Sequence, residues 1–242
     1  MRELYRQPNP EPGQVAGRIV QALDSLTRVA MCDRGVALCL DTMLTGAQQV
    51  ATSGLGALLD DAGMPPAGPV ALSFAAALRG TAQERIVEWS AASRFAELAV
   101  DGLAVAAMEI ATGGRPALLT GVTPAEADAR IAGYAHEGRL HELSGHFLGY
   151  DLDRAFRYFV DRDLSDFVGT PAFPTVGQAH QLLDGVASFC RDSISRLPLG
   201  SAEPLLGDAL AAPETERLPR LQSFLLDTMG QGFDLIGAGG AV

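Results

Sequence analysis

Apolar residues recur at helical spacing along nearly the whole chain, and no other feature of the sequence limits the fold as strongly. In residues 13–31 successive apolar positions are three or four apart, which places them on one face of a helix. The same spacing returns in residues 36–50 and 152–167. Strand patterns are scarce, and RPALLTGV at 115–122 is the one stretch that resembles a strand. The sequence therefore predicts an all-α protein.

Capping patterns predict where several of these helices begin. A Thr before the first helical residue accepts a hydrogen bond from a backbone amide, and a Glu or Gln three residues later bonds back to the Thr amide. Proline directly after the Thr strengthens one of these starts, at Pro124. The predicted starts pair Thr81 with Glu84, Thr123 with Glu126, and Thr175 with Gln178.

We expect about nine helices in an irregular bundle, arranged as one large domain or as two helical subdomains. An extended segment at 1–12 precedes an alanine-rich helical half at 13–114. Glycine and proline around 113–122 separate this half from a second one at 123–230, which is richer in aromatic, histidine and aspartate residues. A flexible glycine-rich tail is expected at 231–242.

Residues 82–112 are predicted to form one long helix that is rich in alanine and glycine. Small side chains allow the backbone of such a helix to approach a neighbouring helix closely. This apolar stripe is equally consistent with packing inside the molecule and with packing across a dimer.

Charge and the absence of lysine exclude several classes of function. All 18 basic residues are arginine, so chemistry that requires a lysine amine, such as Schiff-base catalysis or a phosphate-binding P-loop, is excluded. The net charge of −11 opposes binding to nucleic acid or to an anionic membrane surface, and the arginines form no basic patch. No uncharged stretch is long and apolar enough to predict a membrane-spanning helix.

The cysteines and the N-terminus indicate where the protein resides. Cys32, Cys39 and Cys190 form no CxxC pair, and so few cysteines predict buried, unpaired thiols in a reducing compartment. The charged, proline-rich N-terminus does not resemble a signal peptide. We therefore expect a soluble protein of the cytoplasm.

Three of the four histidines lie at an even spacing of five within AHEGRLHELSGHF at 135–147. The zinc-binding HExxH motif needs histidines four apart on one helix face, so His141 and His146 cannot form it from a regular helix. Each has a glutamate four residues earlier, Glu137 or Glu142, with which it can pair. The apolar pattern shifts phase at Gly138, which predicts a break between two helices. A solvated, ion-paired helix surface is the leading interpretation, and a ligand or acid–base site is the alternative.

The fourth histidine, His180, has Asp184 one helical turn later. This spacing is typical of a local surface pair, and it also suits a metal ligand or an oriented base. If these two residues faced His146 and Glu142 across the bundle, the four side chains could hold a metal ion or perform acid–base chemistry. The sequence otherwise predicts no cofactor.

Aromatic residues are concentrated between 147 and 173, where they alternate with aspartates. Aromatic side chains at helical spacing usually pack in a core, and this is the leading interpretation. The functional alternative is an aromatic-lined pocket for a small molecule. The candidate pocket residues are Phe147, Tyr150, Phe156, Tyr158 and Phe159.

Two hypotheses for the function remain. The leading one is a helical binding or assembly module that docks a protein partner, a second copy of itself or a small apolar ligand. It is favoured by the absence of any catalytic motif and by the extensive apolar helix surface. The rival is an enzyme whose site lies inside the bundle, such as an iron-dependent oxygenase. Its ligands or acid–base groups would be His146, Glu142, His180, Asp184 and His141.

Overall fold

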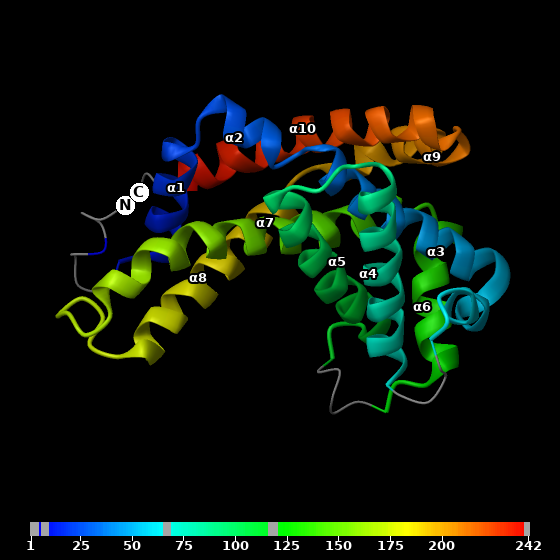
Figure 1. The fold of residues 1–242 in the computed structure, drawn as a ribbon, viewed down its shortest axis with the longest axis horizontal. Helices are drawn as coiled ribbons and strands as arrows, with labels where there is room; N and C mark the ends of the chain where they lie inside the picture. Colours follow the sequence, from blue (N-terminus) through cyan, green and yellow to red (C-terminus); the bar gives the residue numbers. More distant parts are fainter. Residues whose placement is uncertain (1–4, 6–9, 65–68, 116–120, 240–242) are drawn as a thin grey trace.

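The apolar stripes fold into the bundle of helices shown in Figure 1. A computed structural model describes residues 5, 10–64, 69–115 and 121–239. Within these residues every regular element is a helix and none is a strand, so the all-α prediction is confirmed. The strand predicted at 115–122 lies largely outside the described residues.

The helix boundaries determine which parts of the chain can pack together. Two 3-10 helices, η2 (Ser165–Phe167) and η3 (Leu199–Ala202), accompany the α-helices. In chain order the α-helices are α1 (Pro12–Ala22), α2 (Ser25–Ala30), α3 (Arg34–Asp61), α4 (Val70–Glu88), α5 (Arg94–Thr112), α6 (Pro124–His136), α7 (Leu140–Leu164), α8 (Val176–Ser195), α9 (Glu203–Ala211) and α10 (Glu214–Gly239).

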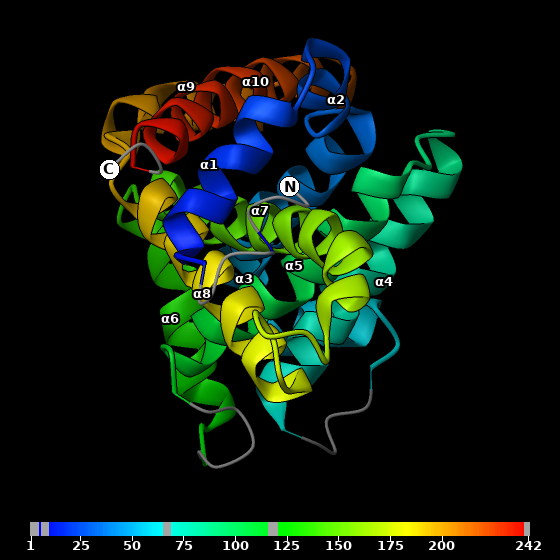
Figure 2. The ribbon, with the colours of Figure 1, turned by 90° about the vertical axis from the view of Figure 1, so that its left-hand side faces the viewer.

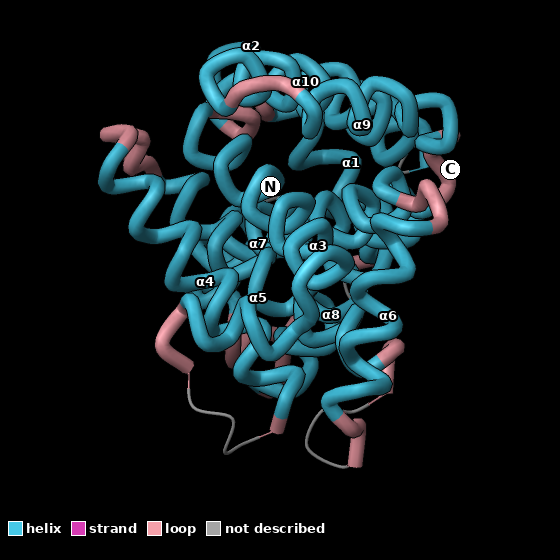
Figure 3. Tube along the Cα trace, turned by 90° about the vertical axis from the view of Figure 1, so that its right-hand side faces the viewer, coloured by secondary structure: helices cyan, strands magenta, loops and turns pink. Residues whose placement is uncertain are grey.

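α10 runs across one end of the bundle together with α1 and α9, and it contacts α3 (Figures 1 and 2). Figure 3 shows the same end of the molecule from the other side. Below α10, α5 packs against α3, α4 and α7, while α6 lies along α3 and α8 pairs with α7. Buried residues from both predicted halves of the chain belong to one continuous core.

Two of the three predicted capping starts are confirmed and one is wrong. Complete capping boxes begin α6 at Thr123 and α8 at Thr175. Thr81 instead lies inside α4, where burial of the flanking turns outweighs the local capping signal. The helix predicted at 82–112 is therefore divided between α4 and α5, and the side chain of Ser93 caps the start of α5.

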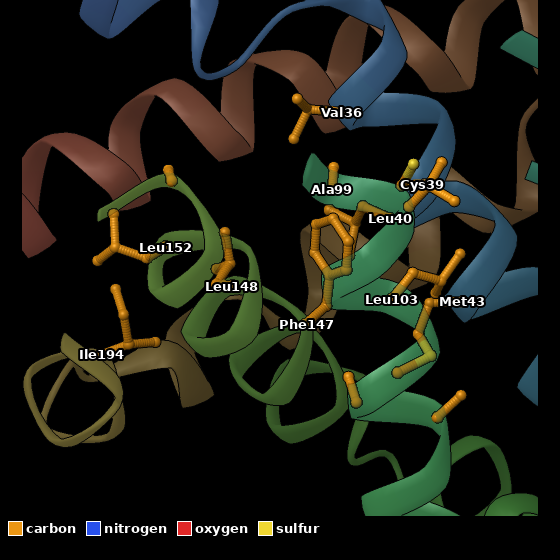
Figure 4. Close-up of a cluster of buried hydrophobic side chains, with 14 of the residues drawn as sticks. Val36, Cys39, Leu40, Met43, Ala99, Leu103, Phe147, Leu148, Leu152 and Ile194 are labelled. Carbon is orange, nitrogen blue, oxygen red and sulfur yellow. The ribbon is translucent and has the colours of Figure 1, made fainter. Parts of the chain in front are cut away.

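The small residues of α5 are used inside the molecule. A Cβ atom at Gly102 would lie 2.9 Å from the backbone nitrogen of Asp151, so the backbone of α7 leaves no room for a side chain at this position. Figure 4 shows Ala99 and Leu103 of α5 beside Phe147 of α7 in the buried core. Of the two predicted uses of this stripe, the described contacts correspond to internal packing.

The single helix predicted at 13–31 is two helices. The first ends at Ala22. Asp24 caps the second, because its carboxylate accepts a hydrogen bond from the Thr27 amide at 2.7 Å. α2 then turns Leu26 and Val29 outward, and these side chains are 79% and 53% exposed. The predicted stripe is therefore buried in α1 and exposed in α2.

α3 is kinked at Gly54, whose φ is 85°. The amide of the next residue, Leu55, donates a hydrogen bond to the carboxylate of Asp128 in α6 at 2.5 Å. A side chain from α6 thus caps the second part of α3. Because a buried amide must find an acceptor, this bond also fixes α6 alongside α3.

The flexible tail predicted at 231–242 is wrong for the residues that the structure describes. α10 continues to Gly239 and packs against α1, with Phe233 and Ile236 buried. Burial of these apolar side chains outweighs the low helix propensity of the neighbouring glycines. Residues 240–242 lie outside the described part of the chain.

Most of the extended segment predicted at 1–12 also lies outside the described residues. Tyr5, which is described, is fully buried. Its ring centroid lies 5.5 Å from that of Phe167 and 6.4 Å from that of Phe173. One aromatic side chain therefore anchors the beginning of the chain to the connection between α7 and α8.

All three cysteines are buried and unpaired, as predicted. Burial raises the pKa of the Cys32 thiol from 9.0 to about 12, and the carboxyl groups of Asp151 and Asp33 contribute. Burial also raises the pKa values of Cys39 and Cys190. These thiols are therefore kept protonated within the core.

A buried aspartate joins three helices. Asp41 of α3 has no exposed surface, and its carboxylate contacts Arg85 of α4 and Arg217 of α10. The distance from Arg217 Nε to Asp41 Oδ1 is 2.7 Å, and Arg85 also donates to the Thr42 hydroxyl at 2.8 Å. Glu214 pairs with the same Arg85 nearer the surface. Because buried charges are costly unless they are paired, these helices must pack together for the group to be satisfied.

Replacement of Asp41 by Ala is expected to lower the free energy of unfolding by about 3 to 5 kcal/mol, because Arg85 and Arg217 lose their buried carboxylate. Urea unfolding followed by circular dichroism measures the change. The control is Glu97→Ala, which removes the exposed partner of Arg94 and should cost about 1 kcal/mol or less. Equal losses in the two variants would contradict the role assigned to Asp41.

Candidate functional site

A cleft of about 550 Å³ opens between α5, α7 and the turn that leads from α8 into η3. Its polar residues come mainly from α7 and α8, with one from α5, and its apolar residues come from the end of α8 and the turn. The polar lining includes Glu109, His141, Glu142, His146, Tyr150 and Arg191. The apolar lining consists of Ile194, Leu197, Pro198 and Leu199.

His141, near the start of α7, is held by Glu203, the first residue of α9. Its Nδ1 lies 2.7 Å from Glu203 Oε2, which also accepts a hydrogen bond from the His141 backbone amide at 2.8 Å. The other oxygen of Glu203 accepts from the Leu140 amide at 3.1 Å. The carboxylate therefore caps α7 and orients the imidazole, whose Nε2 lies beside Gly200 of the cleft lining.

His146 connects α7 to α5 and α6. Its Nδ1 lies 3.3 Å from Glu109 Oε2, and its Nε2 lies 3.5 Å from the Tyr134 hydroxyl. The hydrogen bond from His146 lowers the pKa of Glu109 below its ordinary value, and a hydrogen bond from Tyr150 lowers it further against the opposing effect of burial. Glu109 therefore carries its negative charge in the cleft at neutral pH.

Arg191 of α8 brings a positive charge to the cleft lining. Its Nη1 donates to the carboxylate of Asp153 at 2.7 Å, and Asp153 is a buried residue that also accepts from Arg157 at 2.6 Å. The guanidinium of Arg191 lies over the ring of Tyr150, 5.2 Å from the ring centroid. Asp153 thus fixes α8 to α7 and holds Arg191 beside the cleft.

The structure brings three of the predicted site residues together in this cleft: His141, Glu142 and His146. It leaves out His180, which is exposed on α8, and Asp184, which pairs with an arginine of α7 at 2.8 Å. His180 and Asp184 therefore do not join His146 and Glu142 in this cleft, which was the condition for a four-residue site. Among the described residues no group of three or more His, Cys, Asp or Glu side chains is placed to hold a metal ion.

The predicted pairing of each histidine with the glutamate four residues before it is wrong. Arg139 takes both glutamates, with two bonds of 2.9 and 2.8 Å to Glu142 and one of 3.0 Å to Glu137. A planar guanidinium satisfies a carboxylate with two parallel hydrogen bonds, which an imidazole cannot do. The break predicted at Gly138 is confirmed, because α6 ends before it and α7 begins after it.

The five predicted pocket residues do not form a common pocket. Phe147 and Phe156 have no exposed surface and belong to the core, where Figure 4 shows the first of them. Tyr158 and Phe159 lie against the beginning of α5, away from the cleft. Of the five, Tyr150 lines the cleft.

Glu109, Glu203 and Arg191 belong to the site, although the sequence did not predict them. One local signal could have indicated Glu109, because it is the single charged residue between 102 and 112. The pairing of the histidines with these glutamates could not be predicted, because Glu109 is 37 residues from His146 and Glu203 is 62 residues from His141 along the chain. Only the packing of α5 and α9 against α7 brings these side chains together.

Comparisons with protein-family models, with curated proteins and with solved structures find no match to this chain. Within the described residues, no helix is long and apolar enough to cross a membrane. The function must therefore be inferred from the chemistry and the geometry of the cleft.

Replacement of His146 by Ala is expected to raise the pKa of Glu109, because the hydrogen bond that lowers it is lost. Carboxyl chemical shifts followed by NMR across an acid titration measure this pKa. His180→Ala serves as the control, since His180 lies outside the cleft, and it should leave the titration of Glu109 unchanged.

The same contact predicts how stability depends on pH. Because the pKa of Glu109 is lower in the folded protein than the ordinary value of 4.5, its pairing stabilises the fold above about pH 4.5. This contribution is lost as the pH falls through the lower folded-state pKa. If His146→Ala lost as much stability as the wild type on acidification below pH 4.5, Glu109 would not be the group involved.

Proposed function

We propose that this chain is a helical binding module whose cleft takes up a small amphipathic molecule. The observation that carries the proposal is a cleft of about 550 Å³ that combines an apolar surface with oriented polar groups. Small-molecule sites in proteins are concave, measure about 300 to 1,000 Å³, and place a few polar groups within an apolar lining.

The polar groups of the cleft are positioned by contacts within the chain. Glu203 orients His141 through hydrogen bonds to both its ring and its backbone amide, and Glu109 orients His146. Side chains that are already ordered lose less conformational entropy when a ligand binds. The nearby apolar side chains of Pro198 and Leu199 are not buried by the protein, and they offer surface that a ligand would bury.

Docking of a protein partner or of a second copy receives less support from the described surface. Among the described residues, five of its eight large exposed apolar side chains lie on α2, α9 and α10 at one end of the molecule, and the other three lie on α4 and α8, so they are not gathered on one element. Protein interfaces usually gather such side chains into one patch. The cleft is therefore the feature that best supports a binding function.

We also propose the cytoplasm as the location of this module. Its three cysteines are buried and unpaired. Thiols in this state are typical of a reducing compartment, whereas proteins of oxidising compartments commonly carry disulfides.

Replacement of Ser195 by Trp is expected to abolish ligand uptake, because Ser195 is an exposed residue of the cleft lining that an indole would fill. The probe is phenylbutanol, a neutral amphipathic molecule, titrated into isotopically labelled protein. We expect the amide signals of Gly145, Gly149 and Gly200, which line the cleft, to shift in the wild type.

The matched control is Ser223→Trp, which places the same side chain at an exposed position of α10 outside the cleft. It should bind the probe as the wild type does. Shifts that map to another surface, or a Ser195→Trp variant that still binds, would rule out the cleft as the binding site.

A second candidate, an acid–base enzyme, is favoured by the contact between His141 and Glu203. A neutral imidazole whose Nδ1–H is bound by a carboxylate presents an unprotonated Nε2, which can accept a proton or attack an electrophile. The 2.7 Å contact provides such an arrangement at the cleft lining. Because His180 and Asp184 lie elsewhere, the side chains support the acid–base version of the enzyme hypothesis more than the metal-dependent one.

Nitrophenyl acetate tests this second candidate. Nε2 of His141 attacks the ester carbonyl, nitrophenolate leaves, and water then hydrolyses the acetylimidazole to acetate and the free histidine. We expect His141→Gln to slow nitrophenolate release by at least about tenfold and His180→Gln to leave the rate unchanged. Equal rates for the wild type and His141→Gln would remove the enzyme hypothesis and leave the binding function intact.

A further inference from the structure

The cleft carries an excess of negative charge. Glu109, Glu142 and Asp192 line it, while Glu203 and Asp153 contact residues of the lining. The cationic side chains that line it are Arg191 and the two histidines. Among the lining side chains three carboxylates therefore face one arginine, and the two histidines balance the difference only when both are protonated.

The arginines at the cleft are already committed to carboxylates. Arg191 donates to the buried Asp153 at 2.7 Å and covers one face of Tyr150. Arg139 binds Glu142 through two parallel hydrogen bonds. The guanidinium groups of Arg191 and Arg139 are therefore already paired with carboxylates, and an anionic ligand would have to displace one of these partners.

Glu109 is the carboxylate through which a cation is best bound. It lies between His146 and Tyr150 and its side chain is 33% exposed, so it is partly shielded from water and still accessible from the cleft. Attraction between charges is stronger at a partly buried position than at an exposed one. The neighbouring apolar lining is an independent feature, since it indicates that the ligand has an organic body.

We propose that the ligand of this cleft is an organic cation, an ammonium group carried on an apolar body. The ammonium binds at Glu109, and the body lies against the turn formed by Leu197, Pro198 and Leu199. The inference rests on the proposed function and adds the charge of the ligand to it. An inorganic cation would leave this apolar turn unused, and the described carboxylates do not gather into a metal-binding group.

Three probes with the same apolar body test the proposal: phenylbutylamine, phenylbutanol and phenylbutyrate. Isothermal titration calorimetry gives the three dissociation constants, and NMR shifts at Gly145 and Gly149 confirm where each probe binds. We expect the amine to bind about threefold to tenfold more tightly than the alcohol, and the acid to bind more weakly than both. The preference for the amine should decrease at high salt.

Matched variants separate the cleft from the general attraction of an acidic protein. Glu109→Gln and Glu88→Gln remove the same charge, but Glu88 is exposed on α4 outside the cleft. We expect Glu109→Gln to reduce the amine-to-alcohol preference about threefold to tenfold, and Glu88→Gln to leave it unchanged.

Each result decides a different point. If the alcohol or the acid binds in the cleft as tightly as the amine, the ligand is not a cation, although the binding function stands. If none of the three probes binds, the proposed function itself fails. If Glu88→Gln weakens the amine as much as Glu109→Gln does, the attraction is non-specific and the inference is overturned.

Discussion

The carboxylate of Asp41 joins α10, which crosses one end of the bundle, to α3 and α4. Arg217 comes from α10, near the end of the chain, and Arg85 comes from α4, so the three helices cannot separate without leaving buried charges unpaired. Both guanidinium groups meet the same carboxylate, so the packing of α4 and of α10 against α3 is tied to this buried charge.

Asp153 is a second buried carboxylate that joins two helices by binding two arginines, and it lies beside the cleft. It is buried and binds Arg157 of its own helix and Arg191 of α8. The first bond orients the carboxylate, and the second fixes α8 against α7. The cleft therefore lies between elements whose separation is set by a buried ion pair. A cleft held by such contacts is pre-organised, which lowers the entropic cost of binding.

The sequence predicts the class of the fold well, because apolar spacing and capping are local properties. Thr123 and Thr175 cap helices as predicted, whereas Thr81 lies inside α4, where apolar residues on both sides of it are buried on one continuous helix face. The site was predicted in part. His141 and His146 line the cleft, but their carboxylate partners come from α9 and α5, and residue spacing carries no information about contacts between distant helices. His180 has the same local pattern and remains on the surface.

The absence of lysine also determines how the protein responds to alkali. Every cation in its buried ion pairs is a guanidinium, which keeps its charge at any pH at which a protein is studied. The buried thiols behave differently, because the pKa of Cys32 is about 12 in the folded protein and 9.0 for an ordinary thiol. The stabilising effect of the protonated Cys32 thiol is complete below pH 9 and is lost as the pH rises toward 12. Ionisation of core cysteines therefore destabilises this fold in alkali, while the arginine pairs at Asp41 and Asp153 remain charged.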